Sequence, residues 1–394
     1  MVKFMSSLKI SIARFAMALF HRHPFSYKVL ALSVSVWGYI ILLSAPACAF
    51  MGGYILWRQC AVGGLMTITQ ELSIVTGMGV VAAGWISFRL LRVTYAKPDG
   101  INIDANSHPE LFHLIYETVG IYNARPVDRV ILNCTDKIEL IRTPAWIIPF
   151  CYHTTLAIGL PVLVGHTTRT FACLLTHRIA QYTGKYNREI EFITQMSKTW
   201  IKLGVLLKKY QAADYAVLAT IINAYASINQ ALADPAIKQN ELLADTASLE
   251  LISRADMAQA IAMDFINRQF MKLYFWSKVR HHPTRFSLLD VAAVRHKALT
   301  EEKKIQWLND LFQLPNRPFQ RPTLRSRLQN LGFAQIIELR HQADNAATLF
   351  LAPKPNDTIA QVDQFRLKLQ SRKHRGGRTN TDKAIVRHRH HGVA

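Results

Sequence analysis

Two stretches of the chain decide its fold. They read Thr155-Leu156-Ala157-Ile158-Gly159-Leu160-Pro161-Val162-Leu163 and Thr176-His177-Arg178-Ile179-Ala180-Gln181. The first is apolar, and its alternation from Thr154 to Leu160 predicts a strand. In the second, positions 177 and 181 share one face of a helix. We therefore expect a mainly helical α+β domain with a small sheet beside the helix that carries His177.

The segment around His177 has the spacing of the zinc-binding pattern H-E-x-x-H, but Arg178 replaces the Glu and Gln181 replaces the second His. In that pattern two imidazoles hold one zinc ion while the glutamate activates a zinc-bound water. Only one of those three groups remains here. Taken alone the segment carries little information, because a single helical His is usually a hydrogen-bonded core or surface residue.

Four further blocks occur in the order of a known family. They are Asp128–Asn133, the apolar run 155–163, Gln239–Asp245 and Arg321–Gly332. With the His177 helix they resemble the HtpX-type, membrane-anchored zinc metallopeptidases of the gluzincin group. The resemblance implies that Glu241 stands at the third zinc ligand and that Asp245 orients His177. The last block usually begins with His, where this chain has Arg321.

The departures from the family pattern predict a catalytically inactive protein without a catalytic residue. His177 and Glu241 remain as metal ligands, whereas the amide of Gln181 is a poor zinc ligand. Arg178 stays protonated at any working pH. At about 4 Å and an effective dielectric of about 20, a +1 and a +2 charge repel by about 8 kcal/mol. Good zinc sites gain about 10–16 kcal/mol, so we expect no cofactor, with zinc only if the protein is active.

A buried carboxylate needs a partner, and Arg is well suited to provide it. We therefore expect Arg178 to take the place of the cation by pairing with Glu241, while Asp245 stays hydrogen-bonded to His177. The alternative is that Arg178 points to solvent.

The N-terminal part of the chain predicts a membrane anchor. No charged residue occurs from Val29 to Trp57, and a second apolar run extends from Leu72 to Leu91. About 20 apolar residues span a bilayer, so two transmembrane helices are expected. Basic residues on both flanks predict a multi-pass protein of the bacterial cytoplasmic membrane with its main domain in the cytoplasm. The alternative is a cleaved signal peptide, because Ala45-Pro46-Ala47 has small residues at suitable spacing.

These features divide the chain into five regions. They are a basic N-terminal segment (1–28), the two-helix anchor (29–92), the metallopeptidase-like domain (97–335), a C-terminal helical extension (336–370) and a basic, disordered tail (371–394). The tail carries the residues expected to bind anionic membranes, namely Arg372, Lys373, Arg375, Arg378, Arg387 and Arg389.

Three functions fit this sequence. The first is a silent peptidase-like protein that holds peptides or membrane proteins, with the edge strand of its cleft pairing with an extended segment. The second is an active zinc metalloendopeptidase of membrane protein quality control that recruits a replacement ligand such as His153 or His166. The third is an electrostatic scaffold for anionic lipid or nucleic acid, suggested by the formal net charge of +21. A nucleic-acid partner is the less favoured one, because the tail has no aromatic residues for base stacking.

Overall fold

A computed structural model describes residues 2–61, 76–78, 81, 98–144, 152–182, 188–209, 213–281, 286–317, 319, 321–339, 344–369 and 371. The strands are β1 (Ile101–Ile103), β2 (Arg129–Asn133), β3 (Ile138–Pro144) and β4 (Tyr152–Gly159). The helices are α1 (Val2–Arg22), α2 (Pro24–Ala61), α4 (Pro109–Ile121), α5 (Leu160–Gly165), α6 (Thr168–Ala180), α7 (Arg188–Lys209), α8 (Ala213–Ser248), α9 (Arg254–Phe270), η1 (Met271–Phe275), α10 (Trp276–His281), η2 (Leu288–Asp290), α11 (Val291–Ala298), α12 (Glu301–Gln313), α13 (Leu324–Asn330) and α14 (Ala346–Phe350). The mainly helical α+β prediction is confirmed.

The sheet has four strands in the order β1-β2-β4-β3. β4 pairs in parallel with β2 and antiparallel with β3, so β3 forms one edge. β4 is buried from Thr154 onward. It ends at Gly159, where a Cβ atom would lie 1.9 Å from the carbonyl oxygen of Thr135, so only glycine fits. The strand predicted from the alternation of Thr154 to Leu160 is present up to Gly159, and the rest of the apolar run forms α5, because Pro161 suits the first turn of a helix and cannot donate to a strand ladder.

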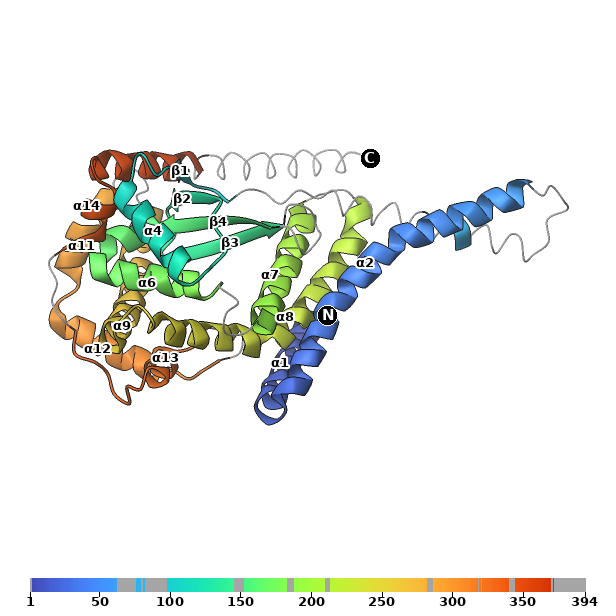
Figure 1. Cartoon of the computed structure of the whole chain (residues 1–394), viewed down its shortest axis with the longest axis horizontal. Coiled ribbons are helices and arrows are strands. Elements are labelled where there is room, and N and C mark those ends of the chain that lie inside the picture. Colours follow the sequence, from blue (N-terminus) through green and yellow to red (C-terminus); the bar gives the residue numbers. More distant parts are fainter. Residues whose placement is uncertain are drawn as a thin grey trace, which may run out of the picture.

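Helix α6 lies along the sheet and contacts β3, α8 and α9, as Figure 1 shows. Its side chains Phe171 and Leu175 join one core with Leu132 of β2 and Ile261 of α9. A helix over residues 355–369 lies beside β1 and adds Val362 to the same core. The helix that carries His177 is therefore held from several sides.

Helices α1, α2, α7 and α8 form a second group beside this core (Figure 1). The predicted transmembrane anchor is contradicted here, because none of the helices in the described ranges is both long and apolar enough to cross a membrane. The first expected span lies within α2, where Tyr27, Ala31, Ser35 and Tyr39 are buried at every fourth position. This period defines a face that packs on other helices.

Polar contacts also join that face of α2 to another helix of the same chain, α8. The Tyr27 hydroxyl donates to the carbonyl oxygen of Leu232 at 2.8 Å, and the Asn229 amide donates to the Ser35 hydroxyl at 3.2 Å. The uncharged run thus reflects helix packing over its first half. Phe50 and Trp57 in its outer half are exposed.

The prediction of a multi-pass membrane location depended on the transmembrane anchor and is contradicted by the same finding. The second expected span, Leu72 to Leu91, lies almost wholly outside the described residues, as do the basic residues of the tail from Arg372 onward. The expected membrane-binding role of that tail is therefore not tested by the structure.

Candidate functional site

Helix α6 presents His177 and Arg178 in its last turn, and both side chains are buried. The helix begins at Thr167, whose hydroxyl accepts a hydrogen bond from the Thr170 amide, as N-cap residues commonly do. Two basic groups near a helix C-terminus interact favourably with its dipole. Gln181 is the C-cap, and its side chain is buried as well.

Helix α8 supplies the facing carboxylates. Glu241 and Asp245 are four residues apart, so they share one face of the helix. The Nε2 atom of His177 lies 3.3 Å from Oε2 of Glu241, and its Nδ1 atom lies 3.0 Å from Oδ1 of Asp245. The three residues that the family resemblance singles out therefore meet, although 64 positions separate His177 from Glu241.

Arg178 points inward and pairs with Glu241. Its Nη1 atom donates to Oε1 of Glu241 at 3.1 Å and to Oε1 of Gln181 at 3.0 Å. The predicted pairing is confirmed, and the solvent-facing alternative is wrong. Gln181 thus serves as an acceptor for the guanidinium.

Arg327 of α13 was missed by the sequence analysis as a site residue. Its Nε atom donates to Oδ2 of Asp245 at 2.8 Å, its Nη2 atom donates to Oδ1 of the same carboxylate, and Nη2 lies 3.5 Å from Nε2 of His177. Such a fork on a carboxylate is the strongest form of ion pair. The signal in the sequence that could have found it is the last family block, H-P-x-L-x-x-R-L-x-x-L-G, whose arginine falls at Arg327.

Arg321, where the family usually has His, also reaches the site. Its Nε atom lies 3.8 Å from Oε1 of Glu241, and its side chain is 40% exposed. Three guanidinium groups therefore surround two carboxylates and one imidazole. We call these six residues the His177 network, which consists of His177, Arg178, Glu241, Asp245, Arg321 and Arg327.

The charges in the His177 network hold both carboxyl groups ionised. Burial by itself raises the pKa of Glu241, but Arg178 and Arg321 outweigh it and hold the pKa well below its usual range. Burial likewise opposes ionisation of Asp245, and the charge and hydrogen bonds of Arg327 lower its pKa in spite of it. For Arg178, burial by itself lowers the pKa, but the charge and hydrogen bond of Glu241 together with the charge of Asp264 outweigh it and raise the pKa.

The residues of the His177 network do not fit a zinc ion. The Arg178 guanidinium contacts Glu241, and the Arg327 guanidinium lies near Nε2 of His177, so two positive charges lie at the two remaining ligands. In the described part of the chain, no group of three or more His, Cys, Asp or Glu residues is placed to hold a metal ion. The proposed replacement ligands do not join either: His153 is exposed on β4, and His166 hydrogen-bonds to Val162.

Comparison with known proteins gives no match: no protein-family model, no curated protein and no solved structure is similar to this chain. The relationship to HtpX-type peptidases consequently stays a prediction from the sequence blocks, and the functional argument depends on the geometry of the site.

Proposed function

We propose that this protein is a non-catalytic, peptidase-like protein that binds extended peptides along the edge of its sheet. The observation that carries the proposal is the His177 network, in which guanidinium groups occupy the ligands of a would-be zinc site beside an edge strand. A site of this composition offers neither a metal-bound water nor a carboxylate free to accept a proton.

Strand β3 supports the binding role. Its Lys137 end is tied to β4, because the Gly159 amide donates to the Lys137 carbonyl oxygen at 3.0 Å. Backbone groups alternate in direction along an antiparallel strand, so those of Ile138 and Leu140 point away from β4. In the ranges that the structure describes, β4 is the one strand that pairs with β3. An extended peptide can add to such an edge through main-chain hydrogen bonds.

The charge beside this edge favours an acidic peptide. The side chain of Arg321 is 40% exposed and lies at the rim of the His177 network. Burial by itself raises the pKa of Glu139 on β3, but the contact with Lys137 and, to a smaller extent, the charge of Arg321 outweigh it and lower that pKa. Glu241 favours the charged form of Arg321, but Arg178 and burial outweigh it and lower the Arg321 pKa to about 10. A peptide carboxylate at this rim would relieve the repulsion between the two guanidinium groups.

The test uses casein, an unfolded acidic protein, as ligand and substrate in one assay. We expect casein to bind in buffer with chelator and to stay uncleaved when zinc is added. Arg321→Glu should weaken binding at least about tenfold, because it reverses a charge at the rim. Arg254→Glu makes the same change at an exposed arginine outside the His177 network and serves as the control.

Zinc content distinguishes the proposal from an active peptidase. Elemental analysis should give equal zinc for the full-length protein and for the His177→Ala, Glu241→Ala variant. Near-unit zinc that is lost in the variant, or casein cleavage that requires His177, would establish an active enzyme. Failure of casein to bind at all would contradict the peptide-binding role.

A further inference from the structure

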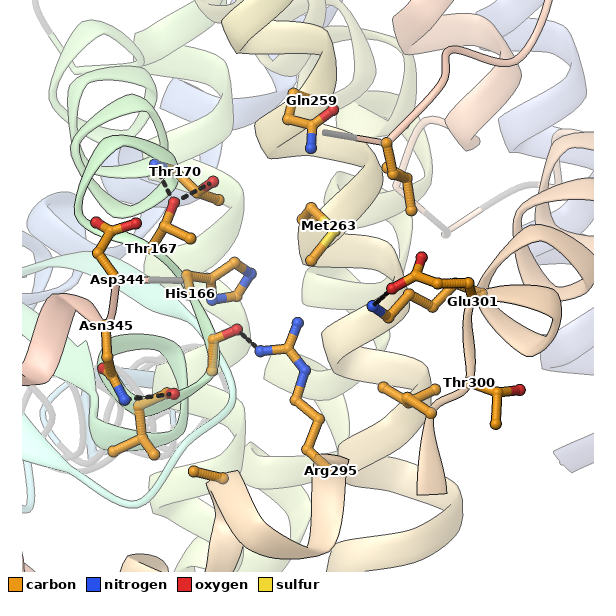
Figure 2. Close-up of a pocket in the computed structure, with 16 residues that line it drawn as sticks. His166, Thr167, Thr170, Gln259, Met263, Arg295, Thr300, Glu301, Asp344 and Asn345 are labelled. Atoms are coloured by element: carbon orange, nitrogen blue, oxygen red, sulfur yellow. Dashed lines mark hydrogen bonds and ion pairs between the residues drawn. The ribbon is translucent and has the colours of Figure 1, made fainter. Parts of the chain in front are cut away.

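A cavity of about 470 Å³ lies at the opposite end of α6 from His177. Its walls come from the start of α6 and from α9, α11 and α12, as Figure 2 shows. No member of the His177 network lines it. Its size falls within the range of about 300–1,000 Å³ that is usual for small-molecule sites.

Arg295 of α11 is directed into this cavity from below (Figure 2). Its Nη1 atom donates to the carbonyl oxygen of Gly165, a neutral acceptor. Within the described ranges Arg295 forms no ion pair with a carboxylate, and burial lowers its pKa to about 10. A partly buried charge that contacts no counter-ion is costly, so the remaining donors of the guanidinium fork point to an anion.

His166 faces the same cavity and lacks a partner on one nitrogen. It is 3% exposed, its Nδ1 atom lies 2.9 Å from the Val162 carbonyl oxygen, and its Nε2 atom is buried with no hydrogen-bond partner. A carbonyl oxygen can only accept, so Nδ1 carries the proton and Nε2 offers a lone pair. Burial lowers the pKa of His166 to about 4, which keeps the ring neutral. The ring therefore needs a hydrogen-bond donor.

The other charged groups of the cavity already have protein partners. The Lys304 ammonium lies 2.6 Å from the Glu301 carboxylate, and the Asp344 carboxylate accepts the Thr168 amide at 2.8 Å. Within the described ranges Arg295 contacts neither of these carboxylates, so its guanidinium is the charged group of the lining that has only a neutral partner besides Asp344. Two carboxylates in the lining oppose a dianion, so a monoanion fits better than a phosphate ester.

We propose that this cavity binds a small organic acid whose carboxylate pairs with Arg295 and whose neighbouring hydroxyl or amino group donates to Nε2 of His166. The apolar body of the acid lies against Met263, Leu299 and Leu339, which also line the cavity. The site is independent of the peptide-binding edge, so either proposal can fail alone.

The test measures binding of matched acids to the full-length protein by calorimetry at neutral pH. The pairs are lactate with propionate, and 3-phenyllactate with 3-phenylpropionate; in each pair only the first acid has the hydroxyl. We expect at least one hydroxy acid to bind with a stoichiometry of one per chain and at least about fivefold more tightly than the matched acid without the hydroxyl. The matched acid has no donor for Nε2 of His166 and leaves that nitrogen without a hydrogen bond. Phenyl phosphate should bind more weakly than that hydroxy acid.

Two variants test the two contacts separately. Arg295→Gln should weaken binding of the hydroxy acid at least about tenfold, whereas Arg254→Gln, the same change at an exposed arginine, should leave it unchanged. His166→Phe should abolish the preference for the hydroxy acid while the match still binds; it also serves if Arg295→Gln does not fold. The proposal is overturned if no acid binds with a dissociation constant below about 10 mM. It is also overturned if Arg295→Gln leaves the affinity unchanged, or if phenyl phosphate binds more tightly than every hydroxy acid.

Discussion

His177 and His166 lie at opposite ends of α6, and both are buried, yet their surroundings differ in kind. Each ring nitrogen of His177 lies within 3.3 Å of a carboxylate oxygen from α8. His166 has a protein partner for Nδ1 and none for Nε2. His177 Nδ1 also forms no hydrogen bond of good geometry, but a carboxylate of the chain lies 3.0 Å from it. Buried polar groups are almost always hydrogen-bonded, so the first ring is held among charged groups of the chain, whereas within the described ranges Nε2 of the second lacks any such neighbour.

The two ends of α6 also differ in whether they leave room for a ligand. At the His177 end, guanidinium groups fill the space where the resemblance implies a metal, and each of the two carboxylates is paired with an arginine. At the His166 end, Arg295 contacts no carboxylate within the described ranges, although Glu301 and Asp344 also line the cavity. We infer that the first end now stabilises the fold and that the second is the better place to search for a small ligand.

The largest expected effect is that of Arg327→Met. Asp245 is 0% exposed and would lose its forked partner, so the uncompensated carboxylate should reduce the free energy of unfolding by about 3–5 kcal/mol. Urea denaturation measures it. Arg325→Met changes an exposed arginine of the same helix and should cost less than about 1 kcal/mol. Equal costs for the two variants would show that Arg327 does not hold the His177 network together.

The next effect is that of Arg178→Ala, at about 2–4 kcal/mol, because it leaves Glu241 with the imidazole of His177 and with Arg321 at 3.8 Å as its only nearby guanidinium. Glu241→Ala should be similarly costly, since it leaves Arg178 buried without its carboxylate. The double variant should be milder than either single one. Unchanged melting temperatures for both single variants would refute the pairing as a stabilising contact.

The parts of the His177 network that could be predicted from the sequence depended on short-range periodicity and charge. The spacing of Glu241 and Asp245 places them on one helix face, and a buried carboxylate calls for an arginine such as Arg178. Arg327 falls at the arginine of the last family block, but its pairing with Asp245 could not be predicted from periodicity and charge, which do not distinguish it from the exposed Arg325. The two arginines differ only in the direction that α13 takes against α8.

The cavity at His166 and the role of α2 were beyond sequence reasoning for a related reason. Arg295 and His166 are 129 positions apart in the chain, and no local sequence pattern indicates that they line the same cavity. The uncharged run in α2 was read as a membrane span, but the same pattern arises when one face of a helix packs on others. Tertiary contacts decide between the two readings.

A change in pH should separate the two ends of α6. His166 has a pKa of about 4 in the folded state, and about 6.5 is usual for the unfolded chain. The unfolded state therefore binds more protons between these values, and stability is lost as the pH falls from about 6.5 to 4, by up to about 3 kcal/mol. Burial is the main cause, while Asp264 opposes it and Arg295 and Arg268 reinforce it.

The carboxylates of the His177 network act in a lower window. Their folded-state pKa values are depressed, so the stability they contribute is present above their usual values near 4 and is lost as the pH falls further. His166→Phe should reduce the slope of the unfolding free energy between pH 6.5 and 4 and leave the lower window unchanged; a smaller slope should remain, because burial also lowers the pKa of His108. A slope that is unchanged in the variant would show that another group is responsible.

The smallest effect is expected for Gln181→Met. Arg178 would lose one acceptor at 3.0 Å but keep Glu241, so the free energy of unfolding should fall by about 1–2 kcal/mol. In the Arg178→Ala background the same substitution should cost almost nothing, since its partner is already gone. Urea denaturation of the two single variants and the double variant gives this coupling. If Gln181→Met costs the same in both backgrounds, the amide contributes through packing alone, and the clamp on Arg178 consists of Glu241 without Gln181.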